Sequence, residues 1–243
     1  MNIFDIVISI GPNDKDIIYQ QLEYTKKNII GYRNIYLISY DPTIFIDGCI
    51  TIDEKIFPFT IETVIKFHKK SYRNGWYLQQ LLKLYAGLVI ANISEKYLVI
   101  DSDTFFLKPT IFIENNKCLY NYGYEYHIPY FEHMLLLDKD LVKVDKNKSG
   151  ICHHMMFEIQ YINELINKIE RNHDDKFYNV FLKLVSDTHK DCSGASEYEI
   201  YYNYMLRNHD DKIIIRELKW ENCGDLKFNN DLDYISCHWV RRT

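Results

Sequence analysis

Two aspartates one residue apart follow directly on a short apolar strand. Residues 97–109 read YLVIDSDTFFLKP, so Asp101 and Asp103 stand where the apolar run ends. An ionised carboxylate is costly to bury unless a cation pairs with it or a metal ion binds it. Two neighbouring carboxylates also repel each other unless a cation lies between them or one takes up a proton. A divalent ion is the economical solution, and hard oxygen ligands suit Mg²⁺ or Mn²⁺.

Three interpretations of this acidic pair compete. In the first, one aspartate caps a turn and the other is solvated. In the second, the pair is the signature of a metal-dependent phosphohydrolase of the haloacid dehalogenase type. That signature requires Thr or Val four residues after the first aspartate and usually opens the domain, whereas this chain has Phe105 there and 100 residues before the motif. In the third, the pair binds the diphosphate of a nucleotide through the metal.

The residues before the pair predict alternating strands and helices. Buried strands are expected at 3–10, 34–40, 49–52 and 97–100. Asp14 is expected to cap a helix after the first strand. The clearest helix is 76–90, in which Leu78, Leu81, Leu82, Tyr85 and Leu88 fall on one side. This order predicts a mostly parallel sheet flanked by helices, with ligands at the carboxyl ends of the strands.

The pattern is looser after residue 110. Residues 118–131 are aromatic and irregular, with possible strands, and helices are expected at 155–171, 176–185 and 196–207. Ser196 and Glu199 have the spacing of a capping box at the start of the last helix. A short strand at 212–217 and a strand or loop at 234–243 complete the chain. Since the sequence has no repeat or linker, we expect one α/β domain, 1–243.

Composition excludes some classes of protein. The net charge of −5 and the pI near 6.0 argue against a nucleic-acid-binding protein. The first residues resemble a strand rather than a signal peptide, and no apolar stretch is long enough for a transmembrane helix. The six cysteines are scattered without a C-x-x-C pair, so reduced thiols and a cytoplasmic location are expected. Attachment to a membrane surface through a partner stays open.

Four motifs in order resemble the GT-A glycosyltransferases, and more narrowly a group of bacterial and viral surface-glycan transferases. They are RNGWYLQQLLKL at 73–84, DSDTFF at 101–106, SEYEIY at 196–201, and His238. The resemblance implies a nucleotide-binding half at 1–107 and an acceptor-binding half at 108–243. It also implies transfer of a sugar from a nucleoside-diphosphate donor, with UDP-sugar favoured by analogy, to a hydroxyl on a glycan, glycolipid or glycoprotein. Inversion of the anomeric configuration is expected, and retention stays open if no general base exists.

The resemblance also implies roles for individual residues. Asp101, Asp103 and His238 would bind Mn²⁺ or Mg²⁺, and an imidazole favours Mn²⁺. The side chains of Arg241 and Arg242 would neutralise the diphosphate, or are simply solvated. Most of the donor-binding residues follow the first strand or lie on the helix before the acidic pair. The predicted donor-binding residues are Gly11, Asn13, Arg73, Gln79, Lys83 and Ser102.

Glu197 is the predicted general base, because an acid at the start of a helix after the D-x-D half has this role in many inverting GT-A enzymes. The alternatives are a first-turn acid favoured by the helix dipole and Glu199 as the base. Tyr124, His154 and Tyr198 are the predicted acceptor contacts. Since adjacent residues of a strand point to opposite sides, only one of His153 and His154 can face a cleft. A metal-dependent phosphohydrolase and a catalytically silent nucleotide-sugar or glycan-binding protein remain the alternative functions.

Overall fold

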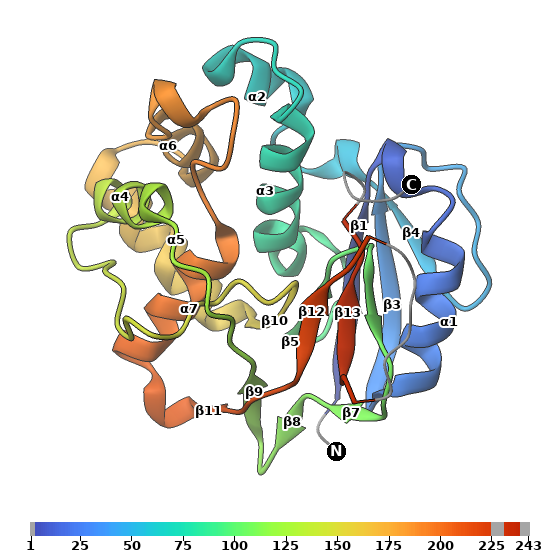
Figure 1. The fold of residues 1–243 in the computed structure, drawn as a ribbon. Helices are drawn as coiled ribbons and strands as arrows, with labels where there is room; N and C mark the ends of the chain where they lie inside the picture. Colours follow the sequence, from blue (N-terminus) through green and yellow to red (C-terminus); the bar gives the residue numbers. More distant parts are fainter. Residues whose placement is uncertain (1–2, 225–230, 239–243) are drawn as a thin grey trace.

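A five-stranded sheet in the order β10–β5–β1–β3–β4 forms the centre of the computed structural model (Figure 1). The structure describes residues 3–224 and 231–238. The strands of this sheet are β1 (Phe4–Ile10), β3 (Tyr32–Ser39), β4 (Ile50–Asp53), β5 (Lys96–Ile100) and β10 (His154–Glu158). All neighbours pair in parallel except β10, which is antiparallel to β5. The predicted α/β class with a mostly parallel sheet is confirmed.

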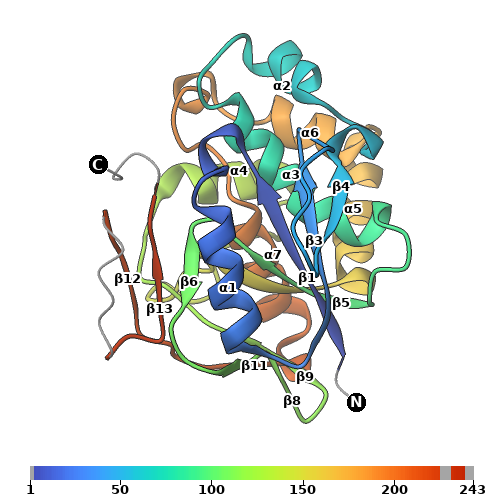
Figure 2. The same ribbon diagram turned by 90° about the vertical axis from the view of Figure 1, so that its right-hand side faces the viewer.

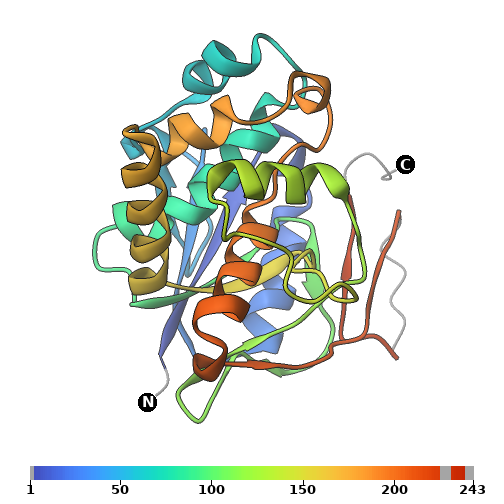
Figure 3. The same cartoon turned by 90° about the vertical axis from the view of Figure 1, so that its left-hand side faces the viewer.

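Helices cover both faces of this sheet, which explains why β1 is mostly apolar and is buried at every position. Helix α1 packs near β6, whereas α3 packs on β1 and β5 and contacts α2, α5 and α7. Figures 1 and 3 show α4, α5, α6 and α7 gathered on the side of α3 away from α1. The helices are α1 (Ile18–Asn28), α2 (Ile61–His68), α3 (Asn74–Val89), α4 (Ile128–Leu137), α5 (Ile159–His173), α6 (Phe177–Lys183) and α7 (Glu197–Asn208).

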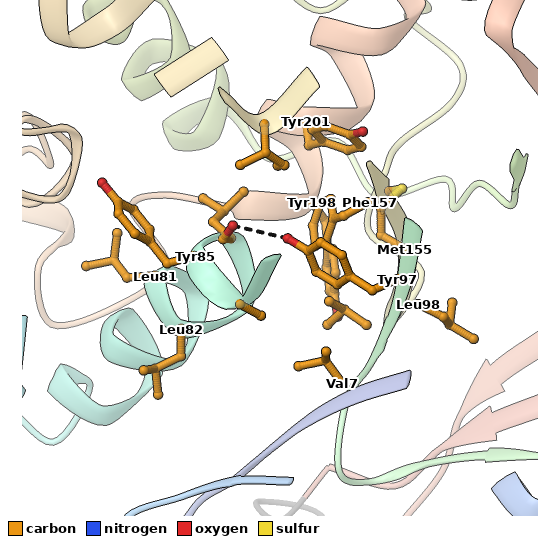
Figure 4. Close-up of a cluster of buried hydrophobic side chains, with 14 of the residues drawn as sticks. Val7, Leu81, Leu82, Tyr85, Tyr97, Leu98, Met155, Phe157, Tyr198 and Tyr201 are labelled. Carbon is orange, nitrogen blue, oxygen red and sulfur yellow. Dashed lines mark hydrogen bonds between the residues drawn. The ribbon is translucent and has the colours of Figure 1, made fainter. Parts of the chain in front are cut away.

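Helix α3 approaches β5 and β10 closely (Figure 4). The Tyr97 hydroxyl donates a hydrogen bond of 3.2 Å to the Leu84 carbonyl of α3, and the Tyr97 ring contacts the Phe157 ring of β10. A Cβ on Gly87 would lie 2.6 Å from the Tyr97 ring, so this position of the helix requires glycine. This close approach fixes α3 relative to the end of β5.

Three small sheets lie beside the central one. One has the order β12–β13–β6, and its strand β13 runs antiparallel to β6, the strand that follows the acidic pair (Figure 2). Another has the order β11–β9–β8, and β2 pairs with β7. Their strands are β2 (Ile29–Ile30), β6 (Thr104–Phe106), β7 (Thr110–Ile111), β8 (Ile113–Glu114), β9 (Lys117–Tyr120), β11 (Ile213–Ile215), β12 (Trp220–Asn222) and β13 (Tyr234–Ser236).

Several local predictions need correction. Residues 155–158 belong to strand β10 rather than to the predicted helix, which begins at Ile159. Asp14 lies in a 3-10 turn (Pro12–Asp14), and α1 begins only at Ile18, so Asp14 does not cap that helix. Helices α2 and α4 were not predicted. Arg241 and Arg242 lie outside the described residues.

The capping box at α7 forms only in part. Ser196 Oγ accepts a hydrogen bond of 3.2 Å from the Glu199 N–H, as predicted. The Glu199 carboxylate instead accepts hydrogen bonds from Ser149 Oγ at 2.6 Å and Asn203 Nδ2 at 2.7 Å. Glu199 is therefore engaged inside the fold by a different set of partners.

The cysteines do not all remain thiols. Cys223 and Cys237 form a disulfide, so the expectation of reduced cysteines is wrong for this pair. The four free cysteines of the described chain are Cys49, Cys118, Cys152 and Cys192. Within residues 3–224 and 231–238, none of the helices combines the length and the apolarity that crossing a bilayer requires.

Candidate active site

The acidic pair lies in the turn between β5 and β6, at the carboxyl edge of the parallel strands. The Asp101 N–H donates to the His153 carbonyl at 3.0 Å, and the Asp101 carbonyl accepts from the Thr104 N–H at 3.0 Å. The first bond ties the turn to the residue that precedes β10, and the second closes the turn itself. Asp101 and Asp103 therefore occupy the edge at which ligands bind in such sheets.

Asp101 is paired with a buried lysine. Lys83 Nζ of α3 donates to Asp101 Oδ1 at 2.5 Å, and the Tyr198 hydroxyl of α7 donates to the same oxygen at 2.7 Å. His153 Nδ1 lies 3.3 Å from Asp101 Oδ2. Burial acts to raise the pKa of Asp101, but Lys83 and His153 outweigh it and hold that pKa well below its ordinary value. Part of the positive charge that the carboxylates require thus comes from the protein itself.

Lys83 also binds Glu197, the first residue of α7. Its ammonium lies 3.0 Å from Glu197 Oε1, and the side chains of Lys83 and Glu197 are only 3% and 4% exposed. Burial raises the pKa of Glu197, and Lys83 opposes that shift. Burial would lower the pKa of Lys83, but Asp101 and Glu197 together raise it, so Lys83 stays charged between two carboxylates.

Gln80 contributes to the same arrangement. It is buried, and its Oε1 accepts a hydrogen bond of 3.1 Å from the Glu197 N–H. This N–H belongs to the first turn of α7, which has no helical partner for its amides. Gln80 and Lys83, three residues apart on α3, together hold the start of α7.

Asp103 faces the C-terminal segment. Its Oδ2 lies 3.6 Å from His238 Nδ1, and its Oδ1 accepts from Ser236 Oγ at 3.3 Å. Its carbonyl accepts from the Cys237 N–H at 2.8 Å. The His238 side chain is 34% exposed. The antiparallel pairing of β13 with β6 is what brings His238, 135 positions away in sequence, to Asp103.

His153 is a site residue that the sequence did not reveal. Its ring lies against the rings of His238, at 4.8 Å between centroids, and Trp220, at 5.1 Å. Its backbone has φ +63°, a left-handed conformation that is rare for non-glycine residues. Its Nε2 is buried and has no hydrogen-bond partner within the described part of the chain. The adjacent pair of histidines was the available signal, but the sequence does not say which of the two faces the site.

The donor atoms at this edge have the chemistry that Mn²⁺ or Mg²⁺ would need, although they do not yet converge. Carboxylate oxygens and an imidazole together suit Mn²⁺. Across residues 3–224 and 231–238, no three His, Cys, Asp or Glu side chains are already placed to hold a metal ion. Asp103 and His238 are adjacent, whereas both oxygens of Asp101 contact protein groups. The orphaned His153 Nε2 is a further nitrogen donor at the same place.

A cavity of about 380 Å³ opens beside this edge, between the loop after β1 and the first turns of α3. Four predicted donor-binding residues line it: Gly11, Asn13, Arg73 and Gln79. Its wall also includes three aromatic residues that were not predicted, Tyr40, Tyr72 and Trp76. The cavity and the acidic turn lie at the ends of neighbouring strands β1 and β5, and α3 runs past both.

Arg73 is oriented over this cavity by neighbours on two sides. Its guanidinium lies 4.3 Å from the centre of the Trp76 ring. It also donates to Ser193 Oγ at 2.6 Å and to the Cys192 carbonyl at 3.2 Å. The loop before α7 therefore fixes a cation and an aromatic face at one wall of the cavity.

The remaining predicted residues are dispersed. Tyr124 is 70% exposed and donates to Glu217, whereas Tyr198 is buried beside Asp101 and Lys83. The ring of His154 is buried among Phe106, Phe112 and Tyr234. The acceptor role predicted for His154 is therefore corrected, because its ring packs in the core and His153 faces the site. Ser102 is buried.

Comparisons with known proteins match the chain to a protein family and to solved structures. The family of unknown function DUF6492 matches residues 42–224. Among solved structures, mouse xyloside xylosyltransferase 1 in its apo form is similar at a TM-score of 0.49 and 10% identity, over 99% of this chain and 99% of that chain. No curated protein matches the chain.

Proposed function

The chain belongs to DUF6492, a family of unknown function, and from its site we propose that it is a metal-dependent glycosyltransferase. The observation that supports this most strongly is the juxtaposition of a nucleoside-sized cavity with an acidic turn at the same sheet edge. Cavities of 300–1,000 Å³ with a few placed polar groups are typical of small-molecule sites. A nucleoside would occupy the cavity, and its diphosphate would extend toward Asp103.

The donor is a nucleoside-diphosphate sugar, with UDP-sugar favoured by the family resemblance. The cavity combines aromatic walls, which suit a base or ribose, with polar groups at its rim. Arg73 supplies a planar cation suited to phosphate or sugar oxygens, and Gln79 supplies an amide on the same helix. The acceptor is a hydroxyl group of a glycan, glycolipid or glycoprotein.

Asp103 and His238 are the residues that would hold Mn²⁺ or Mg²⁺, and Asp101 lies in the same turn as Asp103. When bound, such an ion offsets negative charge on the departing diphosphate. The protein itself supplies a buried ammonium group, that of Lys83, and a buried general base, Glu197. Lys83 holds its charge between Asp101 and Glu197 and orients both carboxylates. Glu197 takes the proton from the acceptor hydroxyl as that oxygen attacks the anomeric carbon from the side opposite the diphosphate. The bond from this carbon to the diphosphate oxygen breaks in the same step, and this single displacement inverts the configuration.

The test is a thermal-shift panel of UDP-, GDP-, CMP- and dTDP-sugars, each with and without Mn²⁺. A donor present at a hundred times its Kd stabilises the fold by about 2.7 kcal/mol, or roughly 5–10 °C in Tm for a chain of this size. We expect one nucleotide class to give this rise, and only with the cation. No rise with any nucleotide sugar, together with phosphate release from simple phosphomonoesters, would contradict the proposal.

Trp76→Ala should weaken the binding of that donor. The indole forms part of the cavity wall and carries the Arg73 guanidinium, and aromatic stacking on a base contributes about 1–3 kcal/mol. We expect Kd to rise by roughly 10- to 100-fold in isothermal titration calorimetry. Tyr126→Ala, which removes an exposed ring that does not line the cavity, is the matched control. Equal Kd values in the two variants would exclude the cavity as the nucleoside site.

A further inference from the structure

We propose that His153 is a ligand of the metal ion, through Nε2, and that Asp101 acts on the ion by orienting this histidine. The inference rests on the metal dependence of the proposed function and changes its ligand set. Sequence resemblance placed Asp101, Asp103 and His238 on the ion. The geometry points instead to His153, His238 and Asp103.

The first step concerns the backbone at His153. Its φ of +63° is left-handed, and such a conformation is costly for a non-glycine residue and persists only where its surroundings impose it. Here the His153 carbonyl accepts the Asp101 N–H at 3.0 Å. This conformation directs the His153 ring to the acidic turn while the His154 ring packs in the core. A glycine would adopt this conformation without strain. The histidine at this position brings an imidazole to the acidic turn.

The second step concerns the two ring nitrogens. Nδ1 lies 3.3 Å from Asp101 Oδ2, so the tautomer that donates Nδ1–H to this carboxylate is the one that offers the Nε2 lone pair to a metal ion. Histidines that bind metals nearly always donate their other N–H to a carboxylate, carbonyl or water. Asp101 is itself fixed by Lys83 at 2.5 Å and by the Tyr198 hydroxyl at 2.7 Å. The Asp101 carboxylate, whose Oδ2 faces the imidazole, is therefore fixed through its other oxygen, Oδ1.

The third step concerns Nε2 itself. His153 is 6% exposed, and its Nε2 has no hydrogen-bond partner in the part of the chain that the structure describes. A buried polar atom without a hydrogen-bond partner destabilises the fold. The His153 ring lies against that of His238, whose Nδ1 is 3.6 Å from Asp103 Oδ2. A metal ion between the two imidazoles and Asp103 would satisfy Nε2, and it requires His238, which is partly exposed, to turn its ring.

Mn²⁺ binding without any sugar donor tests the inference. Asparagine tolerates left-handed backbone, so His153→Asn keeps the fold while removing the imidazole, which a Tm measurement verifies. Loss of an orienting group alone costs about 10- to 100-fold in metal affinity, and we expect His153→Asn to raise the Kd of Mn²⁺ at least tenfold. The matched control is His189→Asn, which removes an imidazole from the 3-10 turn Asp187–His189, outside the acidic turn.

Pulsed electron paramagnetic resonance of bound Mn²⁺ supplies a second readout. We expect two coupled imidazole nitrogens in the wild type and one in His153→Asn or His238→Asn. Unchanged affinity and nitrogen count in His153→Asn, with losses in His238→Asn, would overturn the role of His153 and leave glycosyl transfer untouched. Absence of Mn²⁺ binding in the wild type would also overturn it, whereas a donor that stabilises the protein without the cation would still support transfer.

Discussion

Lys83→Met is expected to lower the free energy of unfolding by about 3–5 kcal/mol, the usual cost of removing one partner of a buried ion pair. The ammonium of Lys83 lies 2.5 Å from Asp101 and 3.0 Å from Glu197, and its side chain is 3% exposed. Methionine fills most of the same volume but leaves two neighbouring carboxylates without their shared cation. Urea denaturation of the two proteins, followed by circular dichroism, measures the difference.

Two further variants show whether charge is the cause. Lys83→Met combined with Glu197→Gln removes one of the stranded carboxylates, and we expect it to recover part of the lost stability. Lys176→Met removes an exposed lysine paired with Glu170, and exposed pairs contribute only about 0–1 kcal/mol. If Lys83→Met were no more destabilising than Lys176→Met, the buried triad would not be a source of stability.

Glu197→Gln is expected to reduce kcat by roughly 10²- to 10⁴-fold, the usual contribution of a general base. The amide oxygen can still accept a hydrogen bond from Lys83, so the variant should fold. Burial raises the pKa of Glu197, and a carboxyl with a raised pKa becomes protonated at a higher pH than an ordinary glutamate, whose pKa is about 4.3. As pH falls through that raised pKa, the base gains a proton and kcat/KM should decline.

Glu199→Gln is the matched control on the same helix turn. Its carboxylate is bound by Ser149 and Asn203 inside the fold, so we expect this variant to lose stability while its kcat per folded molecule stays close to that of the wild type. A Glu197→Gln protein with near-normal kcat and an unchanged acidic limb in the pH profile would remove Glu197 from the reaction. Transfer with retention would then become the better mechanism.

The order of strands and helices in the first hundred residues could be predicted because the apolar residues of each element have the spacing of a helix or of a strand. Helix α3 has leucines on one side, and β1 and β5 are short, mostly apolar strands that are followed by Gly11 and Asp101. Helix α4 escaped prediction because IPYFEHMLLL is apolar almost throughout and lacks a 3.6-residue alternation. Strand β10 escaped because it leads directly into α5, and Phe157 stands four residues before Tyr161, so the apolar spacing of the helix extends back into the strand.

The candidate site was predictable where its residues lie in contiguous motifs, and less so where partners come from far along the chain. The acidic pair predicts that a positive charge lies nearby. The spacing of apolar residues does not identify Lys83, 18 positions earlier, as the partner of Asp101. The cavity residue Trp76 belongs to the motif RNGWYLQQLLKL at 73–84, but no role was predicted for it. His153 was hidden because the sequence does not say which of the two adjacent histidines faces the site, and its left-handed backbone cannot be read from residue spacing.

The position of β10 bears on how the chain holds together. This strand comes from the second half of the sequence, yet it completes the central sheet beside β5 of the first half. The Lys83–Glu197 pair and the packing of Tyr97 on Phe157 cross the same boundary. A fragment that ended at residue 107 would leave the β5 edge unpaired and the Lys83 ammonium without one of its partners. The predicted nucleotide-binding and acceptor-binding halves are thus not separate folding units, and the molecule should gain or lose its structure as one cooperative unit.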